Sequence, residues 1–203
     1  LEVAEVVEIV SGRRPKALRE VCLHIAANML YVEDLQEQKV TESDESYETV
    51  IAPYIAKVKE VIENGTAFEK LCEFTTAQGG DTAVLKDTDK FKKAEYYYDV
   101  VARNSGYITE MDTQQYGIAS MLLGAGRETK ESLLDETAGI KIWKKKGDKV
   151  EVGDTIATLY SSSHAGFRDA ERVLVSACHI GAEAPEEEKL VIARVTGSRV
   201  DWL

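Results

Sequence analysis

The chain has 203 residues and a formal net charge of −11, and 44% of its residues are hydrophobic. This composition supports a buried core in one large domain or two small ones, and it argues against wholesale disorder. The acidic balance argues against nucleic-acid binding, and no apolar run approaches the ~20 residues that span a bilayer. We therefore expect a cytoplasmic protein that binds neither nucleic acid nor membrane.

Helical patterns fill the first 80 residues. Residues 1–10 combine apolar and acidic side chains and begin without a cap residue. This pattern predicts that the sequence starts inside a helix and is a piece of a longer protein. Residues 16–36 repeat apolar side chains at spacings of three and four, which predicts an amphipathic helix with one wide apolar face. His24 and Asn28 fall near that face, and we expect both to be hydrogen-bonded groups at the edge of the core.

A third helix is predicted from residue 47 to Asn64. Pro53 lies inside this pattern and should either kink the helix or mark its true start. Thr66 and Glu69 have the spacing of a capping box, which predicts a short fourth helix.

Composition changes near residue 81, where turn-forming and then β-favouring residues replace the helical pattern. The predicted elements of this part are strands at 96–101, 107–111, 138–143, 155–160 and 189–195, and helices after Thr113 and over 167–177. The sequence thus predicts an α+β fold in which N-terminal helices precede a β-rich, barrel-sandwich-like domain with a few helices. We place the helical segment at residues 1–80 and the α+β domain at residues 81–203.

The three cysteines, Cys22, Cys72 and Cys178, are widely spaced and form no Cys-x-x-Cys pair. This pattern predicts neither a disulfide framework nor a zinc site. The three histidines share no metal-ligand spacing either, so these residue types reveal no catalytic or metal centre.

The turn at residues 124–127 has the two glycines and the cation of an anion-binding turn, in Gly124, Gly126 and Arg127. It follows a helix, whereas the glycine fingerprint of a dinucleotide site opens one. The favoured interpretation is a helix end with an exposed arginine. The functional alternative is a turn that closes over a cleft.

Residues 147–159 are similar to the hairpin region of biotinyl and lipoyl carrier domains. Those domains carry a modifiable lysine just downstream, where this chain has Tyr-Ser-Ser-Ser-His at residues 160–164. One hypothesis for the chain is therefore an independent barrel-sandwich binding or carrier module without a modifiable lysine.

A second resemblance covers nearly the whole chain. In collinear order, the chain resembles the C-terminal part of pyrimidine-nucleoside phosphorylases of the thymidine phosphorylase family. The similar strings are Leu-Glu-Val at residues 1–3, the helix at 23–31, Ala-Gln-Gly-Gly-Asp at 77–81, Ser-Gly-Tyr-Ile at 105–108, Met-Leu-Leu-Gly-Ala-Gly-Arg at 121–127 and residues 139–160. Anthranilate phosphoribosyltransferase, a relative in the same broad fold class, is a third hypothesis for the chain. It lacks the predicted β-rich extension, which argues against it.

The resemblance implies an enzyme that cleaves a pyrimidine nucleoside with inorganic phosphate to give the free base and a pentose 1-phosphate. In that family a Lys-His-Ser-Thr-Gly-Gly loop holds phosphate, and an Arg, a Ser and a Lys hold the base. All of them belong to the N-terminal half, and none of these motifs occurs in this sequence. We therefore expect a C-terminal fragment that lacks catalytic and substrate-binding residues and is inactive without the missing half.

The resemblance also implies one metal ligand, a homodimer and no organic cofactor. The family's site for a cation, potassium or calcium, includes a glutamate that corresponds to Glu5, and carboxylate oxygens suit such hard cations. The other ligands lie upstream, so we expect an incomplete site in this chain.

Overall fold

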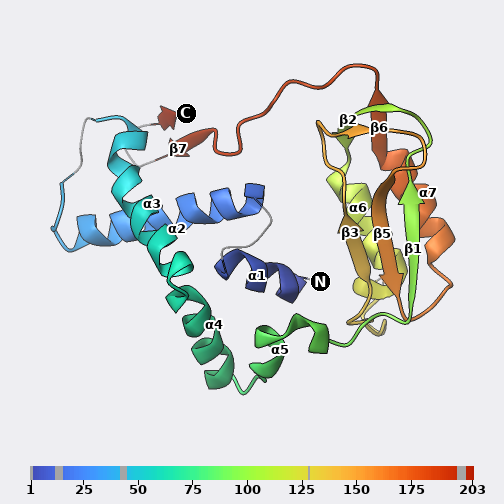
Figure 1. Ribbon diagram of the computed structural model, residues 1–203, viewed down its shortest axis with the longest axis horizontal. Coiled ribbons are helices and arrows are strands. Elements are labelled where there is room, and N and C mark those ends of the chain that lie inside the picture. The colour runs from blue at the N-terminus through green and yellow to red at the C-terminus, as the bar shows by residue number, and fades with distance from the viewer. Residues whose placement is uncertain (1, 12–15, 42–44, 128, 196–199) are drawn as a thin grey trace. The chain divides into compact units, whose positions relative to one another are not determined.

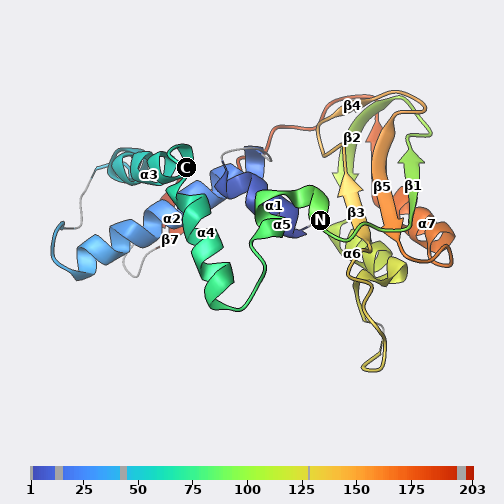
Figure 2. The ribbon, with the colours of Figure 1, turned by 60° about the horizontal axis from the view of Figure 1, so that its bottom comes forward.

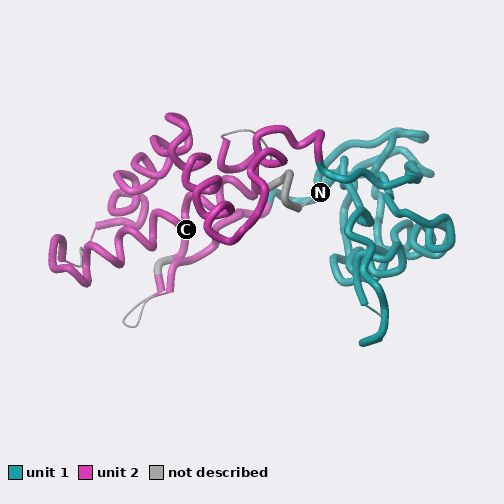
Figure 3. Tube along the Cα trace, turned by 90° about the horizontal axis from the view of Figure 1, so that it is seen from below, with its two compact units in different colours: residues 1, 91–187 teal, residues 2–90, 188–203 magenta. Residues whose placement is uncertain are grey.

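The computed structural model describes residues 2–11, 16–41, 45–127, 129–195 and 200–203 of the chain (Figure 1). Its residues divide into two compact units, a helical unit of residues 2–90 and 188–203 and a β-rich unit of residues 91–187 (Figure 3). The chain therefore leaves the helical unit after Lys90 and returns to it at Glu188. The sequence-based boundary after residue 80 had assigned residues 188–203 to the second domain.

The helical unit is built on two packed helices, α2 and α3. Its elements are α1 (Glu2–Val10), α2 (Lys16–Gln36), α3 (Tyr47–Glu63), α4 (Thr66–Ala77), α5 (Ala83–Lys86), the 3-10 turn η1 (Thr88–Lys90), β7 (Ala193–Val195) and β8 (Val200–Trp202). Tyrosines dominate the core between α2 and α3, where the rings of Tyr31 and Tyr54 meet edge to face at 5.6 Å. The amide of Leu203 donates to the carbonyl of Ile192 at 3.0 Å, and Leu203 packs against the same core.

The bounds of α3 agree with the sequence-based prediction, whereas the cap of α4 differs from it. Ser46 caps α3 by accepting a hydrogen bond from the amide of Thr49, so the helix begins before Pro53 and contains it. The capping box predicted at Thr66 is wrong. The hydroxyl of Thr66 donates instead to Asn64 Oδ1 at 2.7 Å, because the left-handed Gly65 between α3 and α4 brings these two side chains together.

The β-rich unit contains two separate three-stranded antiparallel sheets, β1-β5-β3 and β4-β2-β6. Its elements are β1 (Tyr96–Val101), β2 (Gly106–Met111), α6 (Thr113–Ser120), the π-turn η2 (Met121–Ala125), β3 (Gly139–Ile142), β4 (Lys149–Val150), β5 (Thr155–Ser161), α7 (Phe167–Ala177) and β6 (Cys178–Gly181). The predicted α+β class is confirmed. The sheets do not close into a barrel among the strands that the structure describes.

Both sheets contribute to one core with α6 and α7 (Figures 1 and 2). Ile108 of β2, Leu159 of β5 and Leu174 of α7 are completely buried there. The two strands predicted at 138–143 and 155–160 are present as β3 and β5, and their register places Ile140 opposite Leu159. The helix predicted after Thr113 is α6, and Asp112 caps it through its carboxylate.

Three further elements were not predicted correctly. The two-residue strand β4 and the strand β6 are too short to give an alternating pattern, and the predicted strand at 189–195 is reduced to β7, which pairs with β8. Among the described residues, no helix combines the length and the apolar character that crossing a membrane requires.

Candidate functional site

The glycine turn predicted from the sequence continues directly from α6 through η2. Gly124 has a φ of +104°, and a Cβ atom there would lie 3.2 Å from Asp135 Cβ. A Cβ at Gly126 would meet the side chain of Met121 at 3.0 Å. The positive φ of Gly124 therefore favours glycine for structural reasons, and Arg127 is exposed, as the helix-end interpretation predicts.

Asp135 holds this turn to the end of β5. Its carboxylate accepts hydrogen bonds from the hydroxyl and amide of Thr137, at 2.7 and 2.9 Å, and from the amide of Ser162 at 2.6 Å. The amide of Asp135 donates to the carbonyl of Gly124 at 2.9 Å, and the hydroxyl of Ser161 donates to the carbonyl of Leu123 at 2.8 Å. These bonds join three segments that are distant in sequence.

The same contacts decide the charge state of Asp135. Partial burial by itself would raise the pKa of its carboxyl group, but the hydrogen bonds from Thr137 and Ser162 outweigh burial. The pKa of Asp135 consequently lies well below its usual range, and the carboxylate is ionised at neutral pH. The network explains the architecture of the turn, and whether Gly124, Gly126 and Arg127 close over a cleft stays a prediction.

Glu5, the predicted metal ligand, lies on α1, and its side chain is outside the part that the structure describes. Within the described residues, no three His, Cys, Asp or Glu side chains gather in a way that could hold a metal ion. The assignment of Glu5 to a cation site therefore stays a prediction.

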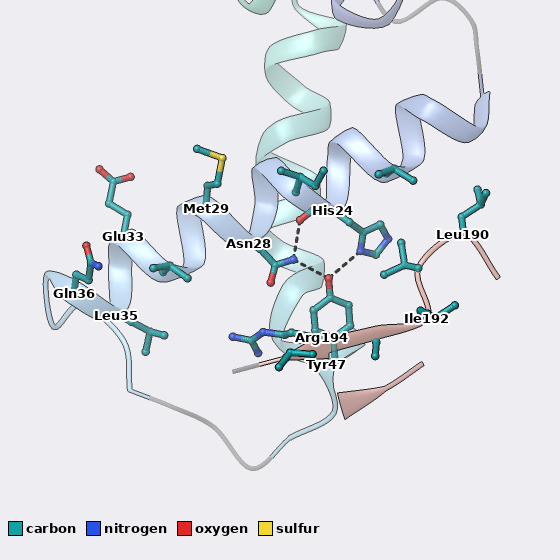
Figure 4. A pocket seen from close by; sticks show the side chains of 16 residues that line it. His24, Asn28, Met29, Glu33, Leu35, Gln36, Tyr47, Leu190, Ile192 and Arg194 are labelled. Carbon is teal, nitrogen blue, oxygen red and sulfur yellow. Dashed lines mark hydrogen bonds between the residues drawn. The ribbon is translucent and has the colours of Figure 1, made fainter. Parts of the chain in front are cut away.

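The helical unit has a groove of about 950 Å³ between α2 and residues 190–195 (Figure 4). Three hydrogen-bonded side chains lie in its middle. The Tyr47 hydroxyl accepts a hydrogen bond from Asn28 Nδ2 at 2.8 Å and lies 3.0 Å from His24 Nδ1. Asn28 Nδ2 also donates to the carbonyl of His24 at 2.7 Å. The expectation that His24 and Asn28 are hydrogen-bonded groups at the edge of the core is confirmed.

Arg194 of β7 lies beside Tyr47 in the same groove (Figure 4). Its guanidinium carbon is 4.8 Å from the ring centre of Tyr31 and 5.8 Å from that of Tyr47, which is the range of cation–π contacts. Through these contacts, the returning segment is anchored on the tyrosine core of the helical unit.

The walls of the groove are apolar and open. Six of its side chains keep between 45% and 74% of their accessible surface: Ile25, Met29, Val32, Leu190, Ile192 and Val195. The sequence predicted one wide apolar face on α2, and the structure leaves Ile25, Met29 and Val32 of that face exposed. Leu23, Ala27 and Tyr31 face the core instead, because α2 is apolar on two sides.

The comparisons with known proteins give these features a context. Residues 107–181 match the family model of the pyrimidine nucleoside phosphorylase C-terminal domain. This segment of the chain is therefore similar to that C-terminal domain. The family resemblance predicted from the sequence is thereby confirmed.

Curated pyrimidine-nucleoside phosphorylases are similar over most of the chain. The protein of Bacillus subtilis (strain 168) is 38% identical over 162 residues, which are 80% of this chain and 35% of that protein. The protein of Geobacillus stearothermophilus is 30% identical over 196 residues, which are 97% of this chain and 42% of that protein. The chain thus spans 35% to 42% of the length of these relatives.

Sequence reasoning missed the groove and the anchoring role of Arg194. A signal was present in the apolar run at residues 190–192, which follows three glutamates and Lys189. It was interpreted as the closing strand of the second domain. The partner of such a short run depends on contacts with α2, which lies far away in the sequence.

Proposed function

We propose that this chain supplies the C-terminal part of a pyrimidine-nucleoside phosphorylase. The reaction converts a pyrimidine nucleoside and inorganic phosphate into the free base and a pentose 1-phosphate. The observation that supports the proposal is the similarity to pyrimidine-nucleoside phosphorylases over 80% to 97% of the chain, with the C-terminal family domain at residues 107–181.

In this proposal, the groups that bind phosphate and base belong to the portion of the relatives that this chain does not match. A phosphate oxygen forms a bond to the anomeric carbon of the sugar while the bond from that carbon to the base breaks, and the base departs with the bonding electrons. Catalysis requires donors that position phosphate and stabilise the departing base. Because the sequence lacks the family's Lys-His-Ser-Thr-Gly-Gly loop, the 203-residue chain is catalytically silent by itself in this proposal.

The same proposal covers the metal, the assembly and the compartment. Glu5 would supply one oxygen ligand to a potassium or calcium ion, and the remaining ligands would come from residues outside the described part of this chain. The whole enzyme would act as a homodimer in the cytoplasm, and residues 124–127 would border its substrate cleft.

Phosphorolysis assays test the division of labour. The purified chain, mixed with uridine or thymidine and phosphate, should release no base above a protein-free blank in a chromatographic assay. Fusion of the chain to the preceding portion of the Bacillus subtilis relative should produce turnover that depends on phosphate. Turnover by the 203-residue chain alone would contradict its proposed silence.

Mass spectrometry tests the carrier alternative. Protein from its own host should lack a biotinyl or lipoyl adduct at every lysine. Such an adduct would favour the independent carrier module over the phosphorylase.

A further inference from the structure

The groove of the helical unit is an apolar surface without a cover among the residues that the structure describes. Ile25, Met29 and Val32 form one wall, spaced by four and three residues along α2, and Leu190, Ile192 and Val195 form the other. Side chains with this spacing share one helix face. Large apolar patches of this kind mark interaction sites on proteins.

The polar middle of the groove is compatible with being covered. Burial of an unbonded polar group is unfavourable, but Tyr47, His24 and Asn28 already bond to one another. Of the other charged and amide side chains in the lining, Arg194 stacks on the rings of Tyr31 and Tyr47. Glu33 and Gln36 lie toward the end of α2 (Figure 4). The middle can therefore be closed without stripping these three groups of their partners.

The shape of the surface favours one kind of occupant. A second copy of this chain would present the same concave surface in a symmetric contact, and a groove does not fill a groove. A convex apolar helix fits between a helix and an extended segment. The relatives contain further polypeptide that this chain does not match, since this chain covers only 35% to 42% of their length.

We propose that the groove receives an apolar helix from the preceding portion of a pyrimidine-nucleoside phosphorylase. This inference rests on the proposed function and names the surface through which the two parts meet. The segment after Glu188 thereby has a role in assembly, because it supplies the second wall of the groove.

Co-expression and fusion test this surface. The 203-residue chain is produced together with the preceding portion of the Bacillus subtilis protein, and separately as a fusion with it. Ile25→Asp and Met29→Asp place a charge on the α2 wall. Leu133→Asp is the matched control, because Leu133 is 93% exposed and lies in the β-rich unit. Circular dichroism and thermal unfolding check that each variant is folded.

We expect a one-to-one complex whose dissociation constant rises at least tenfold with either α2 variant and stays unchanged with Leu133→Asp. The thiol introduced by Met29→Cys should react with maleimide in the chain alone and be protected in the complex and the fusion. A thiol introduced by Leu133→Cys should react in all three. Peptide mass mapping separates these thiols from the native cysteines.

Several results would overturn the proposal. They are a complex insensitive to both α2 variants, a reactive thiol at position 29 in the fusion, absence of a complex between soluble parts, or a homodimer of the chain that closes the groove. Activity distinguishes this inference from the proposed function. A complex that the α2 variants weaken but that shows no phosphorolysis contradicts the proposed function alone. Turnover in a fusion whose thiol at position 29 still reacts with maleimide contradicts the inference alone.

Discussion

Replacing Gly166 with alanine is expected to destabilise the β-rich unit by about 3 kcal/mol. A Cβ atom at this position would lie 2.1 Å from the carbonyl oxygen of Leu122 and 3.0 Å from its carbonyl carbon. Both are backbone atoms of η2, so no side-chain rotation relieves the clash. Either α7 must move away from η2, or the core around Leu174 must repack. Urea unfolding followed by far-UV circular dichroism measures the loss.

Gly117→Ala is the matched control for this substitution. Gly117 lies inside α6, and no atom lies within 4 Å of a Cβ built there. Alanine should therefore stabilise the helix by about 0.5–1 kcal/mol through its better helix propensity. If Gly166→Ala unfolded at the same urea concentration as the unsubstituted chain, the close approach of α7 to η2 would be refuted.

Asp135→Asn is expected to lower the free energy of unfolding by about 2 kcal/mol at pH 7. The amide and hydroxyl of Thr137 and the amide of Ser162 donate to the carboxylate, and an amide group offers only one acceptor oxygen to them. The substitution should also loosen the connection between Gly124 and the end of β5. Thermal unfolding of both proteins at several pH values measures this effect.

The pH dependence has a definite sign. A carboxyl group whose pKa is lower in the folded than in the unfolded chain stabilises the fold above its unfolded pKa of about 4. That contribution is lost as the pH falls toward the folded pKa. The stability difference between the unsubstituted chain and Asp135→Asn should therefore be largest near pH 7 and shrink below about pH 4.

A second aspartate provides the comparison for Asp135. Asp169 forms an exposed ion pair with Arg172 at 3.0 Å, and Asp169→Asn should change stability by less than about 0.5 kcal/mol. Equal effects of the two substitutions, or a pH-independent difference for Asp135→Asn, would contradict the special role of Asp135.

Periodic patterns predicted the long elements of this chain well. The helix over residues 16–36 and the strand over residues 96–101 have the predicted bounds, because many residues contribute to each pattern. The strands predicted at 138–143 and 155–160 are also confirmed. The predicted cap of α4 was wrong because the hydroxyl of Thr66 donates to Asn64 and to the carbonyl of Val61. Sequence spacing does not rank such partners against a capping box.

Predictions that depend on distant contacts were less successful. Local sequence does not reveal that Asp135 receives hydrogen bonds from Ser162, or that Arg194 stacks on Tyr31. The exposed side of α2 is a similar case, since Ile25 and Met29 have the same spacing as residues of a buried face. Periodicity identifies an apolar face, while the partner that covers it is decided elsewhere in the polypeptide.

The return of the chain to the helical unit at Glu188 has a mechanical consequence. Residues near Glu2 and Leu203 both belong to that unit, and the β-rich unit is inserted between its two parts. Tension applied between these residues is therefore borne first by α1, α2 and the segment that carries β7 and β8. The strands of residues 91–187 are shielded from load until that segment has been pulled away from the tyrosine core.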